Sequence, residues 1–298
     1  MAVIWVTGGT GFVGDALISA LIARGDQPIC LTRNPERAQA RHGALAQHVQ
    51  YVDQVDAFEE VPDAMINLSG EGIADQRWTD RRKRQLRASR IGVTRALKAR
   101  LATLGGAPAT VVTGSAVGYY GHSDQPLTEV DPASHDFSAR LCADWEAEAS
   151  DFASLSALYT LRIGVVMGLP GGFLGRLQRP FSLGLGGRLG HGRQMLSWIH
   201  RDDLVALILW CLDGRGAPGV YNATAPNPIS NAEFTRAMGA ALHRPTWMTV
   251  PETPLRLVLG ELADLLFRGQ AVYPTAAEAA GFEFRYKTLE SALSQLFR

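Results

Sequence analysis

Short apolar runs alternate along this chain with longer segments in which apolar residues recur every three or four positions. The first run covers residues 3–6, and leucine and isoleucine then return at helical spacing across residues 15–24. Gly25 ends that pattern, as a glycine after the last turn of a helix does. We interpret this order as an α/β fold with a Rossmann-like, doubly wound parallel sheet. Further strands are expected at residues 28–32, 64–70, 111–121, 158–168 and 219–224.

The later segments are more varied. Residues 77–100 mix apolar positions into an arginine-rich stretch and are expected to form an amphipathic helix with a solvated basic face. The stretch from Gly171 to Gly192 combines glycine with phenylalanine and leucine, which favours a partly packed loop that closes over a ligand. Asp202 or Asp203 is well placed to cap a helix that runs to Leu212. Additional helices are expected at residues 231–242, 254–267 and 288–297, and a strand at residues 246–250.

The turn between the first strand and the first helix reads Thr-Gly-Gly-Thr-Gly-Phe-Val-Gly, residues 7–14. Gly8 permits a tight turn, Gly11 lets the backbone approach a diphosphate, and Gly14 lets the helix pack closely on the strand. The helix N-terminus then points unpaired N–H groups and a partial positive charge at the phosphates. This combination predicts a dinucleotide site, with contacts at the turn from Gly8, Thr10, Gly11, Phe12, Val13 and Gly14.

The end of the second strand indicates which dinucleotide is bound. An NAD site usually places Asp or Glu there, on the 2′-hydroxyl of the ribose, whereas this chain has Thr32 and Arg33. A carboxylate would repel a 2′-phosphate and a guanidinium would match it, which favours NADP(H) over NAD(H). Carboxyl ends of parallel strands line the ligand crevice. The residues expected beside the cofactor at the end of the strand 64–70 are therefore Asn67, Leu68 and Gly70.

Composition argues against several other classes of function. Acidic and basic residues balance at 29 each, so no net charge draws the chain to nucleic acid or to a membrane surface. No apolar run reaches the ~18 residues of a membrane span, and no secretory signal is recognised, so a cytoplasmic location is expected. Cys30, Cys142 and Cys211 are widely spaced and odd in number, which fits reduced thiols, and no cluster has the spacing of metal ligands. RNA binding through residues 77–100 is kept as a minor alternative.

The pattern Thr-Gly-x-x-Gly-x-x-Gly is similar to that of the extended short-chain dehydrogenase/reductases, a group that contains nucleotide-sugar epimerases and dehydratases. Further motifs resemble one atypical branch over essentially the whole chain, the sugar-nucleotide epimerase-like (YfcH-like) family of unassigned reaction. These motifs are Arg77-Trp78, Ser89-Arg90, Gly118-Tyr119-Tyr120-Gly121, Trp145-Glu146, Gly184 to Gly187 and Trp198-Ile199-His200. The resemblance implies NADP binding.

It also implies a division into domains. Residues 1–168 would form the nucleotide-binding domain, to which residues 195–225 return. Residues 169–194 and 226–298 would form a smaller α/β C-terminal substrate domain. His200 is interpreted as a scaffold histidine with satisfied ring nitrogens rather than as an acid or base.

The chain departs from its relatives at the catalytic pair. Extended enzymes use a Tyr-x-x-x-Lys pair, in which the lysine lowers the pKa of the tyrosine. Lys83, Lys98 and Lys287 are the only lysines here, and none follows a tyrosine by four residues, so the pair is absent. In an ungapped alignment Ala116 takes the place of the usual catalytic hydroxyl, and Arg90 takes the place of a typical asparagine.

The remaining candidates come from positions that match the family. If the chain is catalytic, Ser115 would donate a hydrogen bond to a developing oxyanion, and Tyr119 or Tyr120 would donate a proton. Glu146 would act as an acid or base of raised pKa if buried beside Trp145. Further family positions in the crevice are Arg162, which with Ser115 is expected to contact the cofactor, and Asn222, near the substrate.

These expectations combine into an NADP(H)-binding protein of the epimerase or oxidoreductase type. Its substrate would be a hydroxylated small molecule, including nucleotide-linked ones, and epimerisation would proceed through transient hydride transfer. The alternative is a catalytically silent NADP(H)-binding sensor or regulatory protein, which the missing Tyr-x-x-x-Lys pair favours. A monomer or a homodimer is expected.

Overall fold

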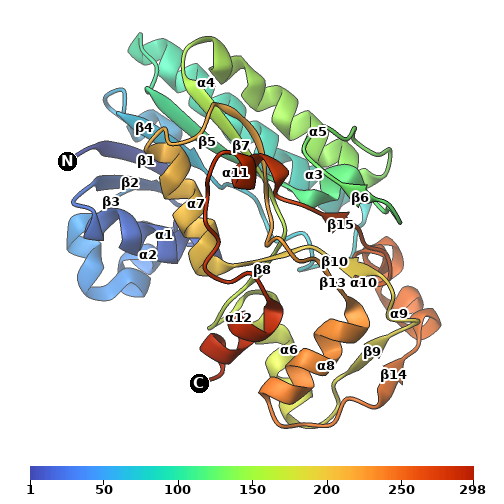
Figure 1. Ribbon diagram of the computed structural model, residues 1–298. Coiled ribbons are helices and arrows are strands. Elements are labelled where there is room, and N and C mark those ends of the chain that lie inside the picture. The colour runs from blue at the N-terminus through green and yellow to red at the C-terminus, as the bar shows by residue number, and fades with distance from the viewer.

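The computed structural model describes residues 1–298 and is built around a seven-stranded parallel sheet (Figure 1). The strand order is β12-β7-β5-β4-β1-β2-β3. The order reverses at β1, so the carboxyl ends of β1 and β4 flank the crevice in which doubly wound sheets bind ligands. The strands are β1 (Val3–Thr7), β2 (Gln27–Leu31), β3 (Gln50–Val52), β4 (Ala64–Asn67), β5 (Thr110–Ala116), β7 (Ala157–Ile163) and β12 (Gly219–Ala223). The predicted fold class is confirmed.

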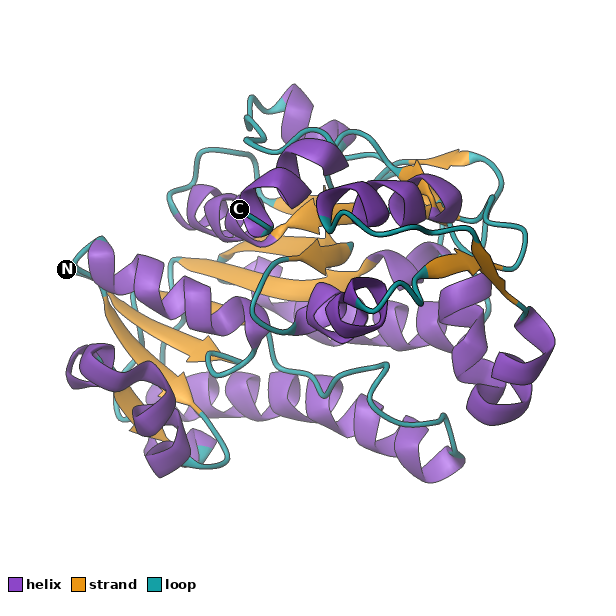
Figure 2. Ribbon diagram, turned by 90° about the horizontal axis from the view of Figure 1, so that it is seen from below, coloured by secondary structure: helices purple, strands orange, loops and turns teal.

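Helices cover both faces of the sheet (Figure 2). Successive strand side chains point to opposite faces, and β1 follows this rule: Ile4 and Val6 pack in one core cluster and Trp5 in another. Because both faces are buried, the strands are apolar throughout rather than alternating. The first face is covered by α1 (Phe12–Ala23) and α7 (Arg201–Leu212), the second by α4 (Val93–Leu104) and α5 (Phe137–Ser150).

The arginine-rich segment is helical, as expected, but it is not one uniform helix. Thr79 caps α3 (Asp80–Arg87) by accepting a 3.2 Å hydrogen bond from the backbone N–H of Arg82. A single π-helical turn, Ala88–Gly92, then leads directly into α4. Such turns are frequent at functional sites, and this one places Ser89 and Arg90 beside the segment that follows β4.

The strand expected at residues 158–168 is divided into two. β7 ends at Ile163, and β8 (Val165–Met167) leaves the central sheet to pair with β11 (Trp198–His200). A Cβ atom on Gly164 would lie 2.8 Å from the carbonyl oxygen of Ser197. Glycine therefore lets the chain pass close to its neighbour as it changes sheets.

The glycine-rich stretch is not the loop that its composition suggested. Most of its first half is α6 (Gly172–Ser182), whose Leu174 and Phe181 are buried. Its phenylalanines and leucines recur at helical spacing, and this periodicity outweighs the glycine content. The expectation of partial packing is confirmed, while the expectation of a loop is wrong.

A second, smaller core joins α6 to the C-terminal elements (lower part of Figure 1). It includes Leu174, Trp198, Phe234 and Leu293, all 2 % exposed or less. The helix expected over 254–267 is interrupted at Gly260, where φ is +61°. The elements of this part are β9 (Gly187–Leu189), β10 (Met195–Leu196), β13 (Ile229–Ser230), α8 (Asn231–Ala241), β14 (Met248–Val250), α9 (Glu252–Leu259), α10 (Asp264–Phe267) and α12 (Leu289–Leu296).

Part of the C-terminal segment packs on the central sheet instead. Ala277 of α11 (Thr275–Ala279), with Phe282 and Phe284, belongs to the core cluster beneath α7 and β12. Two further short strands, β6 (Pro126–Leu127) and β15 (Ala271–Val272), pair with each other, and α2 (Pro35–His42) follows β2. None of the helices is long and apolar enough to cross a membrane.

The N-terminus of α7 corrects the capping expectation. His200, not an aspartate, is the N-cap: its Nδ1 accepts a 3.1 Å hydrogen bond from the backbone N–H of Asp202. Asp203 instead accepts the backbone N–H groups of Arg285 and Tyr286 at 3.0 and 2.9 Å. Burial lowers the pKa of His200, which suits a neutral ring that accepts at the cap.

Candidate functional site: a dinucleotide cavity and a buried polar network

The glycine turn after β1 has the geometry that a dinucleotide needs. A Cβ on Gly8, whose φ is +74°, would lie 2.4 Å from the carbonyl oxygen of Leu68. A Cβ on Gly14 would lie 2.1 Å from the carbonyl oxygen of Gly8. Both positions therefore require glycine. The N-cap of α1, Gly11, has no side chain to cap the helix, so the N–H groups of Phe12 to Gly14 have no partner within it and stand ready for an anion.

A cavity of about 950 Å³ opens beside this turn, between the carboxyl ends of β1, β2 and β4. The predicted cofactor residues that line it are Gly8, Thr10, Gly11, Thr32, Arg33, Leu68 and Gly70. Phe12, Val13 and Gly14 lie in the adjoining first turn of α1.

Asn67 is used differently. It is fully buried, accepts hydrogen bonds from the hydroxyls of Thr7 and Ser69 at 2.7 Å, and donates to Thr94 at 2.9 Å. Its amide joins the ends of β1 and β4 to α4, so it shapes the floor of the crevice without lining the cavity.

Three arginines approach the cavity from the same side. Arg33 follows β2, and Arg37 and Arg41 come from successive turns of α2, whose N-cap Asn34 accepts the backbone N–H of Arg37 at 2.8 Å. Arg33 and Arg41 each have a carboxylate partner at 3.3 Å. Arg37 has none. Only Arg33 was predicted from the sequence. Arg37 and Arg41 follow it at intervals of four residues, a spacing that could have identified them because residues four apart share one face of a helix.

The loop after β4 is held by two more arginines. The side chain of Arg82, 5 % exposed, binds the carboxylate of Glu71 and donates to the carbonyl oxygen of Gly72 at 2.8 Å. Arg90 donates to the carbonyl oxygen of Glu71 at 2.9 Å, and Ser89 accepts the N–H of Glu71 at 3.1 Å. Burial lowers the pKa of Arg90. The π-helical turn thus positions one wall of the cavity.

The candidate catalytic residues form a second, separate arrangement. Ser115, at the end of β5, donates a 2.6 Å hydrogen bond to Glu146 of α5. Arg162 of β7 binds both carboxylate oxygens of Glu146, at 3.0 and 2.9 Å. Burial opposes the charged guanidinium, but the hydrogen bonds and charge of Glu146 outweigh it, so the pKa of Arg162 is raised. Two parallel hydrogen bonds of this kind fix the orientation of the carboxylate as well as its position.

The two tyrosines differ in what their hydroxyls do. Tyr120 donates to Asn222 at 2.7 Å and accepts from Arg162 at 2.8 Å. Burial raises the pKa of Tyr120 to about 12. The hydroxyl of Tyr119 bonds to no residue of the chain, while its ring lies 3.5 Å from the guanidinium carbon of Arg162. Tyr119 is therefore the member of this set whose polar atom is available to another molecule.

Cys142 lies one turn before Glu146, and burial raises the pKa of its thiol to about 11. It therefore stays protonated and unreactive.

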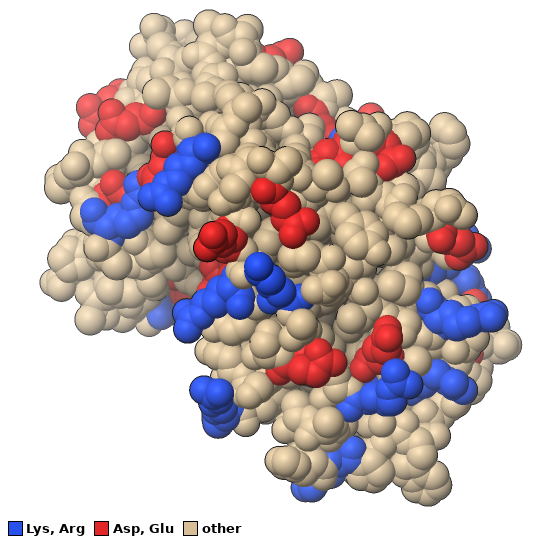
Figure 3. Space-filling model, in the orientation of Figure 1, with Lys and Arg blue, Asp and Glu red and all other residues tan.

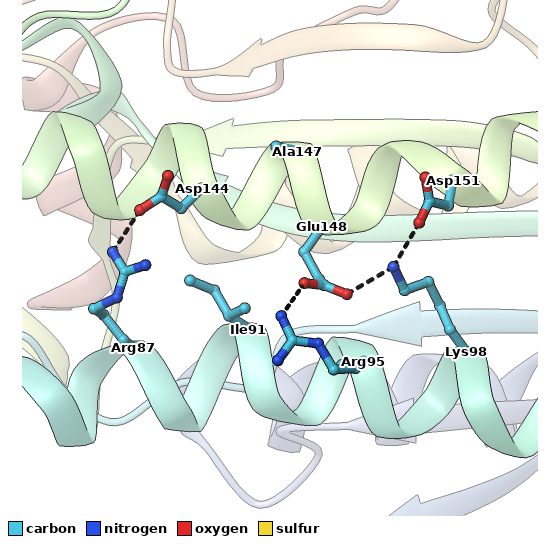
Figure 4. Close-up of a pocket in the computed structure, with 8 residues that line it drawn as sticks. All are labelled: Arg87, Ile91, Arg95, Lys98, Asp144, Ala147, Glu148 and Asp151. Carbon is cyan, nitrogen blue, oxygen red and sulfur yellow. Dashed lines mark hydrogen bonds and ion pairs between the residues drawn. The ribbon is translucent and has the colours of Figure 1, made fainter.

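Three basic side chains of the helical segment 80–104, namely Arg87, Arg95 and Lys98, pair with carboxylates of α5 and its C-cap Asp151 (Figure 4). Arg95 binds Glu148 at 2.7 Å, and Lys98 lies 2.7 Å from both Glu148 and Asp151. Positive and negative side chains are also interspersed on the face seen in Figure 3. These pairs neutralise part of the charge that had suggested RNA binding.

The parallel sheet with its reversed strand order, the glycine turn and the cavity beside it define a dinucleotide-binding protein of the Rossmann type. The family model of the NAD dependent epimerase/dehydratase family matches residues 4–224, and a domain of unknown function (DUF1731) matches residues 250–296.

Individual proteins agree with this assignment. An epimerase family protein of Mycobacterium tuberculosis is 39 % identical over 98 % of this chain and 96 % of its own. The crystal structure of the human epimerase family protein SDR39U1 with NADPH superposes with a TM-score of 0.89 and 32 % identity, and covers 99 % of both chains. A nucleoside-diphosphate sugar epimerase of Corynebacterium glutamicum gives a TM-score of 0.77 at 29 % identity over 99 % of this chain and 58 % of that one.

The chain belongs to the NAD dependent epimerase/dehydratase family, in the branch of extended short-chain dehydrogenase/reductases whose reaction is unassigned.

Proposed function

We propose that this protein binds NADP(H) in the cavity beside the glycine turn. It would use the coenzyme for oxidoreduction, or for epimerisation through transient hydride transfer, on a hydroxylated small molecule, with nucleotide-linked ones included. The observation that carries the coenzyme assignment is the set of arginines at the end of β2 and along α2, one of which, Arg37, has no counter-charge. The human relative crystallised with NADPH supports it.

The residues present fit such a coenzyme. Gly8 and Gly14 keep Cβ atoms out of the turn, and the uncapped N-terminus of α1 supplies N–H donors for a diphosphate. Arg33 and Arg37 would bind the 2′-phosphate, since guanidinium forks match phosphate oxygens. When bound, the reduced coenzyme would supply a hydride, and in epimerisation the oxidised coenzyme would accept a hydride from the substrate and return it. The fully buried Asn67 keeps the ends of β1 and β4 in register beneath it.

The chemistry of this chain would centre on Tyr119. Its hydroxyl, which bonds to no residue of the chain, can donate a proton to a substrate oxygen, and the guanidinium of Arg162 against its ring fixes the position of that ring. Arg162 donates hydrogen bonds to Glu146 and Tyr120, and Glu146 also accepts one from Ser115. These three residues would therefore hold Arg162, and with it Tyr119, in position.

Calorimetry with NADPH and NADH tests the coenzyme, and single-turnover oxidation of bound NADPH with a substrate panel tests the reaction. We expect NADPH to bind more tightly, and Tyr119→Phe to slow turnover while leaving NADPH affinity unchanged. If neither NADPH nor NADH binds, the proposed function is wrong as a whole. A turnover rate unaffected by Tyr119→Phe would remove only the role of that tyrosine.

A sensor that holds NADP(H) without turnover is the second candidate. It is favoured by the hydrogen bonds that Ser115, Glu146 and Tyr120 already make within the protein. These bonds leave few groups free to act as acid or base toward a substrate. An NADPH-dependent interaction with another protein, together with no turnover on any candidate substrate, would establish the sensor in place of the enzyme.

A further inference from the structure

One carboxylate of the cavity lies between two arginines from different parts of the chain. Glu71, in the loop after β4, places Oε1 3.3 Å from Nη1 of Arg33 and binds Arg82 through Oε2. Arg33 follows β2 and Arg82 belongs to α3. The contact between Glu71 and Arg33 therefore joins the loop after β2 to the loop after β4, two parts of the cavity wall.

The two arginines differ greatly in exposure. The side chain of Arg33 is 89 % exposed, whereas that of Arg82 is 5 % exposed and also donates to the backbone of Gly72. An exposed ion pair contributes only ~0–1 kcal/mol, so Arg33 can leave Glu71 easily. Separating buried Arg82 from Glu71 would leave an unpaired buried charge, which costs several kcal/mol. Arg82 is thus the permanent counter-charge of Glu71, and Arg33 is an exchangeable one.

This arrangement creates a competition for Arg33. A 2′-phosphate that reaches Arg33 meets the carboxylate of Glu71 already bound there, and the two anions repel each other across a few ångströms. An unphosphorylated ribose offers hydroxyls instead, which can donate to a carboxylate. Glu71 therefore disfavours the phosphorylated coenzyme relative to the unphosphorylated one, and Arg82 limits the effect by neutralising part of its charge.

We propose that Glu71 is a specificity-determining residue that lowers the preference for NADP(H), and that buried Arg82 sets how strongly it does so. The inference rests on the proposed function, because it concerns the same cavity and the same coenzymes. Glu71 is an acidic determinant of coenzyme choice in a site where only arginines had been given that role. The quantity to measure is therefore the ratio of the two coenzyme affinities rather than either affinity alone.

The first test is Glu71→Gln, which keeps the size of the side chain and an oxygen acceptor for Arg82. We expect the ratio of the NADH dissociation constant to the NADPH dissociation constant to rise three- to tenfold, with a smaller rise at high salt, where exposed charges are screened. The matched control is Asp53→Asn, which removes an acid from the same cavity that has no ion pair with Arg33. An unchanged ratio in Glu71→Gln, or an equal rise in Asp53→Asn, would overturn the proposal.

The second test removes the permanent counter-charge. Arg82→Gln leaves Glu71 with its full charge, and we expect the ratio to fall three- to tenfold. The double variant Glu71→Gln with Arg82→Gln should recover a ratio within about twofold of Glu71→Gln alone, because the charge that Arg82 neutralised is gone. The double variant must first show the wild-type circular dichroism spectrum. If its ratio of dissociation constants then stays below that of Glu71→Gln by more than about twofold, the role of Arg82 is contradicted.

The proposed function and the role of Glu71 can be refuted separately. If the unmodified protein binds neither coenzyme, the proposed function is wrong. If it binds NADPH and the ratio ignores Glu71, the proposed function stands and only this inference is lost.

Discussion

The fork between Glu146 and Arg162 allows a sharp prediction about stability. Glu146→Gln keeps the shape of the side chain but removes its charge, opposite a guanidinium whose side chain is 5 % exposed. Hydrogen bonds to charged groups are worth ~1.5–3 kcal/mol and neutral ones ~1 kcal/mol. Arg162 makes two bonds to this carboxylate and Ser115 makes a third, so we expect a loss of ~2–3 kcal/mol.

Truncation to alanine should cost more. Glu146→Ala leaves Arg162 buried without its counter-charge, for which ~3–5 kcal/mol is typical. At ~2–4 °C per kcal/mol for a chain of this size class, Glu146→Gln should lower the melting temperature by about 5–10 °C. Urea unfolding followed by tryptophan fluorescence gives the free energies directly.

The control is two residues further along the same helix. Glu148 pairs with Arg95, whose side chain is 69 % exposed, and with Lys98 (Figure 4). Glu148→Gln should cost less than Glu146→Gln, because Arg95 and Lys98, unlike Arg162 with 5 % exposure, can turn to solvent when the carboxylate is removed. The double variant Glu146→Gln with Arg162→Met should cost less than the sum of its single variants. A Glu146→Gln protein within about 0.5 kcal/mol of the unmodified chain would refute the interpretation that the charge of Glu146 stabilises the fold, since about 0.5 kcal/mol is the low end for a single hydrogen bond.

Other predictions address the turn, the arginines and the network. Arg37→Gln should weaken binding of NADPH and 2′-AMP about tenfold or more by calorimetry, because a charge-assisted phosphate contact is lost, while NADH affinity stays the same. The control Arg179→Gln, at an exposed position of α6, should leave all three affinities unchanged. Gly14→Ala should abolish coenzyme binding, because its Cβ would meet the carbonyl oxygen of Gly8 at 2.1 Å; wild-type affinity would contradict the turn geometry. Tyr120 holds its proton more tightly in the folded state, with a pKa of about 12 against 10.0. Its stabilising effect is complete below pH 10 and is lost as the pH rises from about 10 to 12. Thermal melts across that range should therefore show a steeper loss for the unmodified chain than for Tyr120→Phe, and parallel curves would exclude this contribution.

Several features of the fold could be predicted because they depend on local sequence. The glycine turn is one: the positive φ of Gly8 and the close approach of Gly14 to the carbonyl oxygen of Gly8 both arise within a few residues. The place of Arg33 beside the cavity is another, since it depends only on the distance from that turn to the end of β2. Six of the seven strands of the central sheet were predicted, because apolar runs between helices have few alternatives; the three-residue edge strand β3 was missed because it is too short to give such a run.

Other features could not be found in this way. The N-cap of α7 was assigned to an aspartate because residue type favours it, yet Asp203 serves the distant backbone of Arg285 and Tyr286. The glycine count of residues 171–192 concealed α6, whose buried face is defined by a partner core that includes Phe234 and Leu293.

The sequence by itself determined the class of fold and the place of the dinucleotide turn, because periodicity and glycine spacing are properties of neighbouring residues. Only the tertiary structure decided how the polar residues are used. Glu146, expected as a tunable acid, lies in a fork with Arg162, sixteen residues away on another element. Glu71, Arg33 and Arg82 meet because three separate segments converge on one cavity. Charge pairing depends on distances in space, and those distances are set only when the sheet and its helices pack together.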